Sequence, residues 1–363
     1  MPRAVRLVVA SAAFLALAAC SSSSSSSAAC TPRVPTDETF PSTLAEWCQV
    51  TLDGGEVTAL SSDIVPFTLT TPLYSDGAIK RRTVRLPPGT VASYDDAGVL
   101  GFPNGTVFTK SFGFRDDARN TALPIHWVET RIQWRAAGTW NYMAYRWNAA
   151  GTEATALQGG EVVPISYVDV DGASQNARYL VPSQLQCEQC HSESGPVAPI
   201  GPKARWLNTD YAYASGPENQ LAHWTRIGIL SGAPDPANAP RLPVASDPDA
   251  GTVEQRARSY LEANCGFCHS PAGNARVTGL YLQATVTDSI QLGICKRPVA
   301  AGPGAGGRPY DVFPGQPDAS VIPYRMSSTE PAVAMPQIGR SVVDTHGVEL
   351  VTQWIQELPG TCQ

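Results

Sequence analysis

Two five-residue segments of this chain share one spacing of cysteine and histidine, Cys-x-x-Cys-His. They are residues 187–191 (CEQCH) and residues 265–269 (CGFCH). On one turn of a helix, two cysteines three residues apart lie on the same face, where both thiols can add to the vinyl groups of a haem. The histidine that follows can then bind the haem iron through its imidazole. The spacing therefore predicts covalent attachment of haem c at both segments.

The residues expected to carry this chemistry form two matched sets. Covalent attachment is predicted at Cys187, Cys190, Cys265 and Cys268, and proximal ligation of iron at His191 and His269. A single motif of this kind is only a moderate signal, but two copies in a chain with 5 histidines are a strong one. The predicted cofactors are two haem c groups.

Paired cysteines have three other common uses in proteins. A zinc ribbon expects about 15–20 residues between its two cysteine pairs, whereas 74 residues separate Cys190 from Cys265. A thioredoxin-type redox motif needs a βαβ context, and neither segment follows a buried parallel-strand pattern. Structural disulfides would not require the histidine after each pair. Haem attachment is favoured at both segments.

A c-type haem commonly takes a sixth iron ligand, and a methionine thioether in that position raises the reduction potential. Met335 is the candidate for the second haem, because it stands before Pro336 on a predicted loop ahead of the last helix. The competing interpretation is a methionine that fills a gap in the core. Met326, nine residues earlier, is expected to be a packing neighbour.

The sixth ligand of the first haem stays open at this stage. No methionine occurs between His191 and Met326. His223 is one candidate distal ligand, and Met143, His126, Met326 or an open iron site are others. An open site would matter chemically, because it would let the iron bind peroxide or another small ligand.

Two helices are expected to position the second motif. Residues 252–255 (TVEQ) match a capping box, and an apolar face then continues from Val253 directly into the motif. Asp344 can cap a closing helix whose apolar stripe includes Trp354. Residues 246–363 are therefore predicted to form a helical, cytochrome c-like domain.

Residues 181–245 are predicted to form a first haem segment. Only four residues separate Pro182 from the motif, so the usual preceding helix is missing.

The region before the motifs has a different sequence pattern. Residues 40–180 contain short strand-like runs between Gly, Pro, Asn and Asp turn signals. Residues 127–134 alternate in the period of a half-buried strand. This predicts an antiparallel β-sandwich or barrel-like domain, and an α+β multidomain protein as a whole.

The N-terminus predicts export, which haem c attachment requires in bacteria. Residues 1–19 read as a signal peptide, with Arg3 and Arg6 before an apolar run too short to span a bilayer. The run ends in a lipobox-like sequence, so Cys20 is the expected acylated residue. The competing interpretation is ordinary signal peptidase cleavage before a cysteine. Residues 20–39, with serines at 21–27, are predicted to be a flexible tether.

These features predict a lipoprotein of the cell envelope, attached to the membrane by its lipid anchor. Ser21 stands where an aspartate would often retain a lipoprotein in the inner membrane, so the outer membrane facing the periplasm is favoured, with the cell surface also open. Removing residues 1–19 takes the formal charge from −6 to about −8, which disfavours nucleic acid as a partner. Periplasmic or outer-membrane redox proteins are the expected partners.

Four cysteines lie outside the motifs. An oxidising compartment favours disulfides, and four cysteines allow three pairings. Proximity in the sequence suggests Cys30–Cys48, which leaves Cys295–Cys362 to tie the closing helix to the region of the second haem.

Several further segments resemble a family of exported bacterial dihaem c-type cytochromes, whose members are often encoded beside a parallel β-helix repeat protein. The resemblance runs from about Phe40 to Ile355. It rests on residues 71–76 (TPLYSD), 129–131 (ETR), 199–205 (PIGPKAR), 219–221 (NQL), 256–261 (RARSYL), 298–302 (PVAAG) and 324–326 (YRM). The family implies haem binding and electron transfer, without a defined substrate. Cys48 follows Trp47 where the family tends to have glycine, which leaves any inherited N-terminal disulfide open.

These observations favour an electron carrier over a catalyst. The alternative is a haem enzyme in which a five-coordinate first haem reduces peroxide or oxidises a small molecule, while the second haem exchanges electrons with it. A third interpretation is a surface protein whose strand-rich region recognises a partner or glycan. It ranks last, because the chain offers no signature for such a ligand.

Overall fold

The computed structural model describes Met1, residues 30–192 and residues 195–363. The predicted signal peptide, the acylation site Cys20 and the serine run lie outside the described residues. The chain from Pro32 to Gln363 forms one compact unit, to which all elements below belong. Across the residues that the structure describes, no helix is both long and apolar enough to cross a bilayer.

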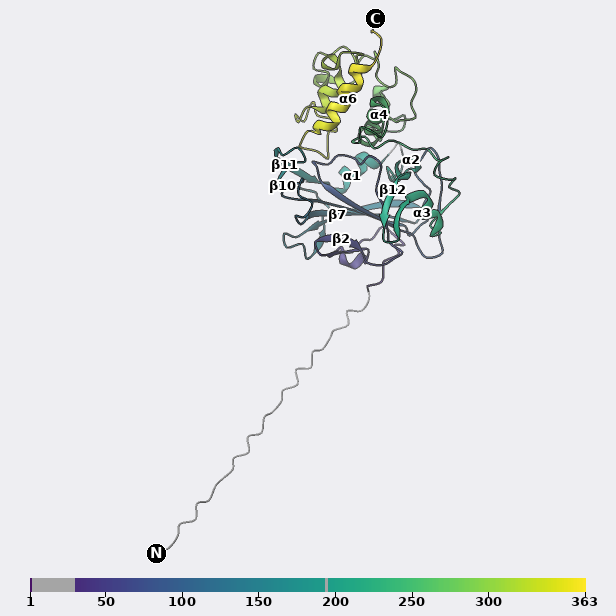
Figure 1. The fold of residues 1–363 in the computed structure, drawn as a ribbon, viewed down its shortest axis with the longest axis vertical. Coiled ribbons are helices and arrows are strands. Elements are labelled where there is room, and N and C mark those ends of the chain that lie inside the picture. Colours follow the sequence, from purple (N-terminus) through teal and green to yellow (C-terminus); the bar gives the residue numbers. More distant parts are fainter. Residues whose placement is uncertain (2–29, 193–194) are drawn as a thin grey trace. The chain divides into compact units, whose positions relative to one another are not determined.

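The protein is a mixed, strand-rich structure with both helices and strands, and its largest sheet is antiparallel (Figure 1). In spatial order this sheet contains β3 (Val65–Pro66), β4 (Ile79–Arg85), β6 (Val107–Phe114), β7 (His126–Ala136), β8 (Thr139–Trp147) and β9 (Ala154–Ala156). Three antiparallel hairpins accompany it: β1 (Val50–Asp53) with β2 (Glu56–Ala59), β10 (Glu161–Val168) with β11 (Ser174–Val181), and β12 (Asp210–Tyr213) with β13 (Gly216–Asn219). A short parallel pair joins β5 (Ala92–Ser93) to β14 (Leu230–Ser231).

The helices are concentrated after Val181. They are α1 (Gln184–His191), α2 (Ala204–Leu207), α3 (Gln220–Arg226), α4 (Val253–Asn264), α5 (Val321–Met326) and α6 (Thr345–Glu357). Short 3-10 turns occur at η1 (Ala45–Trp47), η2 (Arg276–Thr278), η3 (Gly302–Ala305) and η4 (Pro317–Ala319). The change from mainly strands to mainly helices and loops that the sequence predicts near Pro182 is therefore present.

Strand β7 shows why the sheet forms where it does. The alternating run predicted at residues 127–134 lies inside β7, and its apolar members Ile132 and Trp134 are buried. The next strand, β8, pairs with it across a two-residue turn in which Ala137 and Gly138 have φ of 49° and 84°. Such positive values match the right-handed twist of the two strands.

The two faces of the sheet pack against different neighbours. Ile132 and Met143 are paired across β7 and β8, and both belong to a core shared with η1, β1 and β2. Because side chains alternate along a strand, their neighbours Arg131 and Ala144 point to the opposite face. On that face, the hairpin β10–β11 covers one end of the sheet.

Residues 200–240 cover the other end of that second face. Leu207, Leu221 and Trp224 are fully buried with Phe67 and Phe108 of the strand-rich part. The hairpin β12–β13 also lies in this stretch, where the sequence predicted only helix and loop. Its short strands, Asp210–Tyr213 and Gly216–Asn219, carry few β-branched residues, so they lack the usual signal.

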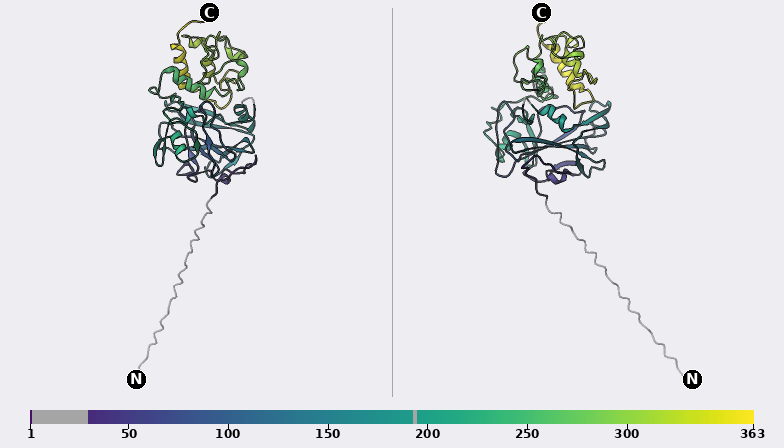
Figure 2. Two further views of the ribbon diagram at one scale, coloured as in Figure 1. Left: turned by 90° about the vertical axis from the view of Figure 1, so that its right-hand side faces the viewer. Right: turned by 180° about the vertical axis from the view of Figure 1, so that it is seen from behind.

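The C-terminal helices form a separate apolar cluster. Helices α4 and α6 pack against each other in the green-to-yellow part of Figures 1 and 2. Both begin with the caps that the sequence predicts, a capping box at Thr252 and a side-chain cap at Asp344. A disulfide joins Cys295 to Cys362, the pairing expected from the sequence, with Cα atoms 5.2 Å apart. The Cys30–Cys48 pairing stays a prediction.

The loop before β4 connects the strand-rich part to these helices. The backbone N–H of Tyr74 donates to Asn264 Oδ1 at 2.7 Å, at the last residue of α4. The Asp76 carboxylate accepts hydrogen bonds from the backbone N–H groups of Ser341 and Val342, at 2.6 and 2.8 Å. The second motif is therefore held in a fixed position relative to the sheet.

Candidate functional site

The first motif lies on α1, a helix that starts only three residues before Cys187. Ser183 caps it in a reciprocal capping box with Gln186, so a short helix forms although no longer helix precedes the motif. Helix α1 contacts β8 of the central sheet (Figure 1). The motif therefore rests on the second face of that sheet.

His191 is oriented as a metal-binding histidine would be. Its Nδ1 is 2.9 Å from the carbonyl oxygen of Ala198, and its ring centroid lies 4.6 Å from that of Tyr142. With Nδ1–H donating to this carbonyl, Nε2 carries the lone pair and is the available ligand atom. Burial lowers the pKa of His191 to about 4, so the imidazole is neutral near pH 7.

The second motif continues the last turn of α4, as the sequence predicted. Cys265 is the C-cap residue, and the backbone N–H of His269 donates to its carbonyl at 2.9 Å. The Nδ1 atom of His269 is buried without a hydrogen bond of good geometry, with the backbone of Leu280 within reach of the ring. Burial lowers the pKa of His269 to about 4 as well.

One cavity of about 740 Å³ borders both motifs. This volume lies within the range of about 300–1,000 Å³ that cofactor and small-molecule pockets usually occupy. All six residues of the predicted covalent attachment and proximal ligation line it, namely Cys187, Cys190, His191, Cys265, Cys268 and His269. Motifs separated by more than 70 residues in the sequence thus face a shared space.

The two motifs are direct neighbours within this cavity. The thiols of Cys190 and Cys268 are hydrogen-bonded, and this contact lowers the pKa of Cys190. The side-chain amide of Asn274 also donates to the carbonyl of Gln189, next to Cys190. The attachment point of one predicted haem therefore adjoins that of the other.

Three methionines border the cavity, and their packing differs. Met335 and Met326 both border the cavity, and Met326 is almost completely buried. The Met335 loop is fixed by Arg340, whose guanidinium donates to the Met335 carbonyl at 2.8 Å. Met143 contributes to the cavity wall, but it packs with Ile132 in the core on the far face of the sheet.

The structure does not bring His223 to the cavity. Its ring stacks on Tyr213 with centroids 3.4 Å apart, and its Nδ1 lies 2.6 Å from a carboxylate oxygen of Glu218. His223 is thus engaged on α3 and does not line the cavity. Its assignment as the distal ligand of the first haem stays a prediction. His126 is largely exposed on β7, beside Asp116.

The donor set fits haem better than a bare metal ion. Within the described ranges, no three His, Cys, Asp or Glu side chains converge in a way that would hold a metal. A zinc site needs about four such ligands, whereas haem brings four nitrogens of its own and asks the protein for one or two. A neutral histidine beside two thiols meets that requirement at each motif, and at the first motif the Ala198 carbonyl also orients the ring.

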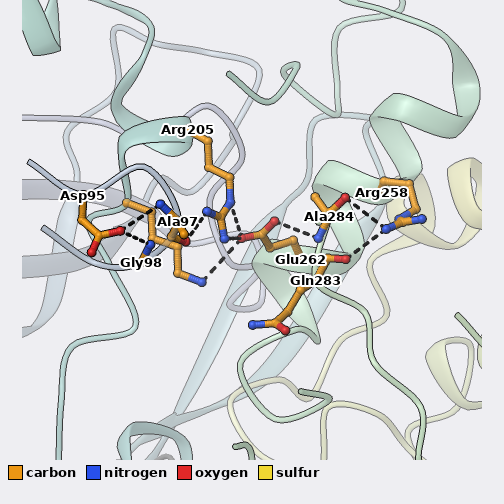
Figure 3. A network of polar contacts seen from close by, with 9 residues as sticks. Asp95, Ala97, Gly98, Arg205, Arg258, Glu262, Gln283 and Ala284 are labelled. Atoms are coloured by element: carbon orange, nitrogen blue, oxygen red, sulfur yellow. Dashed lines mark hydrogen bonds and ion pairs between the residues drawn. The ribbon is translucent and has the colours of Figure 1, made fainter. Parts of the chain in front are cut away.

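A buried ion network holds Glu262 of α4, close to the second motif, to Arg205 of α2 (Figure 3). Arg205 donates to Glu262 Oε1 from Nε and Nη2 at 2.8 and 2.5 Å, and Glu262 lies on α4, three residues before Cys265. The other oxygen of Glu262 accepts the backbone N–H of Ala284 at 2.9 Å. Arg205 also donates to the carbonyl of Ala97. The two ionic partners are at most 5 % exposed.

Sequence reasoning missed this pair and also a row of cations in the cavity wall. Arg82, Lys110 and Arg131 line the cavity.

Comparison with known proteins yields no relative: no family model, no curated protein and no solved structure matches this chain. The resemblance to dihaem cytochromes therefore stays a prediction.

Proposed function

We propose that this protein is a dihaem c-type cytochrome that transfers electrons in the bacterial cell envelope. Haem c would be attached at Cys187 and Cys190, and at Cys265 and Cys268. The observation that carries the proposal is the single cavity lined by both Cys-x-x-Cys-His motifs. When bound, haem iron supplies a one-electron couple; the protein supplies attachment, ligands and burial.

The residues divide this work between them. His191, oriented by the Ala198 carbonyl, would hold the first iron. His269 and Met335 would hold the second, which corresponds to the helix–motif–loop–methionine–helix order of a cytochrome c-like domain. The contact between Cys190 and Cys268 would make the two cofactors neighbours, as electron exchange between them requires.

The cellular setting belongs to the same proposal. Acylation of Cys20 and the serine-rich tether would hold the protein at a membrane, with the outer membrane facing the periplasm favoured. Soluble or membrane-bound redox proteins of that compartment would be its partners. Intact mass of the mature protein and of a Cys20→Ser variant tests the anchor.

The role of Met335 has a direct spectroscopic test. Met335→Ala is expected to abolish a near-infrared sulfur-to-iron band and to lower one of two reduction potentials, because the thioether favours the reduced iron. Met143→Leu is the matched control, since Met143 packs on the far face of the sheet. An unchanged band and potentials in Met335→Ala would remove Met335 from the iron.

A second candidate function follows from the first motif. Of the candidate sixth ligands, His223 does not line the cavity, Met143 packs in the core on the far face of the sheet, and Met326 belongs to the C-terminal cluster with the second motif. This favours a five-coordinate first haem, able to reduce peroxide or oxidise a small molecule. High-spin signals that shift with cyanide would support it, and two low-spin, inert haems would exclude it.

A further inference from the structure

A row of cations crosses the sheet beneath the first motif. Arg82 on β4 pairs with Lys110 on β6, and Lys110 pairs with Arg131 on β7. Residues in register on neighbouring strands point to the same face. All three line the cavity, and both Lys110 and Arg131 are close enough to His191 to influence its charge.

Only one of these three charges has a carboxylate partner. Arg131 forms a two-point ion pair with Glu129, at 2.9 and 2.5 Å. Glu129 is completely buried and also accepts the Tyr179 hydroxyl at 2.6 Å, so its oxygens are already used. Across the described ranges, no ion pair involves Arg82 or Lys110.

Arg82 is the clearest sign of a missing partner. The residue is 8 % exposed, and its Nη2 atom is buried with no hydrogen-bond partner. A buried charged donor without a partner is costly, so such groups in folded proteins are paired or bind a ligand. Burial lowers the pKa of Arg82 to about 10 and that of Lys110 well below its usual value. An anion bound in the cavity would raise the pKa of both Arg82 and Lys110.

The neighbouring aromatic ring does not meet this need. Lys110 Nζ lies 4.8 Å from the centroid of Phe112, and the Arg131 guanidinium carbon lies 4.4 Å from it. A second lysine, Lys80, approaches the same ring at 5.9 Å. Cation–π contacts offset part of the burial cost, but they leave the concentration of like charge in place.

We propose that Arg82, Lys110 and Arg131 form an anion-binding site on the sheet wall of the cavity, which takes a carboxylate or a small inorganic oxyanion. A planar guanidinium can bind either group through two parallel hydrogen bonds. The anion has two possible sources, a propionate of the first haem or a free anion that enters the cavity. Only the first source rests on the proposed function.

The test compares Arg82→Gln with Arg81→Gln. Arg81 is the next residue on β4, but it points to the opposite side and pairs with Glu56 at 3.1 Å, with about 40 % of its side chain exposed. Both variants remove one positive charge from the same strand. Lys110→Met provides a second cavity variant in case Arg82→Gln does not fold.

Two measurements distinguish the sources. The first is thermal unfolding of the full mature protein, with and without haem, in acetate and in inorganic phosphate at constant ionic strength, because a ligand of the native state raises its stability. The second is the pair of reduction potentials of the haem-loaded protein. The first measurement needs no haem, so it stays informative if the proposed function fails.

If the ligand is a free anion, acetate or phosphate should raise the unfolding temperature of the haem-loaded wild type and of Arg81→Gln until the site is saturated. The apparent affinity for the anion should fall at least tenfold in Arg82→Gln. If the ligand is a haem propionate, added anion should not stabilise the haem-loaded wild type, whereas it should stabilise the haem-free protein. One reduction potential should then shift downward in Arg82→Gln but not in Arg81→Gln. The proposal is overturned if Arg82→Gln and Lys110→Met match Arg81→Gln in both measurements.

Discussion

The first Cys-x-x-Cys-His motif lies on an 8-residue helix that rests against a β-sheet, whereas the second ends a 12-residue helix that packs against α6. Near the first motif the cavity wall carries Lys110 and Arg131. Met335 and Met326 lie in the C-terminal part, with the second motif. The same five-residue spacing thus occurs in two settings. If both motifs attach haem as proposed, the motif would define the attachment chemistry and the surroundings would set the properties of each iron.

The largest expected effect comes from removing one attachment pair at a time. Cys187→Ala/Cys190→Ala and Cys265→Ala/Cys268→Ala should each lower the covalent haem content from two to one. The second variant should also unfold at lower temperature, because its motif extends a helix of the C-terminal core. Absorbance of the pyridine complex and intact mass measure the content. Two haems retained in either variant would refute the assignment of that pair.

Breaking the buried ion pair beside the second motif should have the next largest effect. Glu262→Ala leaves Arg205 charged and buried, which is expected to cost about 3–5 kcal/mol of unfolding free energy. Glu56→Ala is the control, since Glu56 pairs with Arg81 at the surface. Chemical denaturation measures both. Equal losses in the two variants would show that burial of the Glu262 pair is unimportant.

The haem-free protein should lose stability in acid. His191 and His269 have pKa values of about 4 when folded, against about 6.5 in an unfolded chain. Between these values the unfolded state binds more protons, so the free energy of unfolding falls as the pH drops from 6.5 to 4. The slope should approach about 1.4 kcal/mol per pH unit for each histidine.

Denaturation of the haem-free protein at several pH values measures this slope. His269→Gln should reduce it by the contribution of one histidine, and His191→Gln should do the same. A slope that neither substitution changes would show that other groups cause the acid sensitivity.

Removing the helix caps should have the smallest effect on stability, and it should affect haem attachment differently at the two motifs. Ser183→Ala and Thr252→Ala each remove a capping box, which typically costs about 1 kcal/mol. Helix α1 is short and only partly buried, so Ser183→Ala should also lower the yield of haem attached at the first motif. Helix α4 is packed against α6, so Thr252→Ala should leave attachment at the second motif unchanged. Tryptic peptides that carry haem report each site separately.

The local features were the ones that the sequence predicted well. The caps at Thr252 and Asp344, the strand at residues 127–134 and the Cys295–Cys362 disulfide all depend on near neighbours or on simple pairing. Periodicity and capping chemistry express such constraints directly in residue order.

The long-range features were missed because residue order does not encode them. The adjacency of Cys190 and Cys268 depends on how α4 docks against the first part of the chain, for example through Glu262 and Arg205 of α2. The cation row depends on the register of three strands, which places Arg82 beside Lys110 only after the sheet has formed. His223 had the right side chain for a ligand, but its position on α3 directs it to Glu218.

The central claim is that both motifs bind haem covalently. The most direct test is the intact mass of the mature protein, produced with a bacterial haem c maturation apparatus, together with the absorbance of its reduced pyridine complex. The account predicts a mass increase of two haem groups that survives acid denaturation, and a matching absorbance of two haem c per chain. A mass without added haem, or with only one, would contradict it.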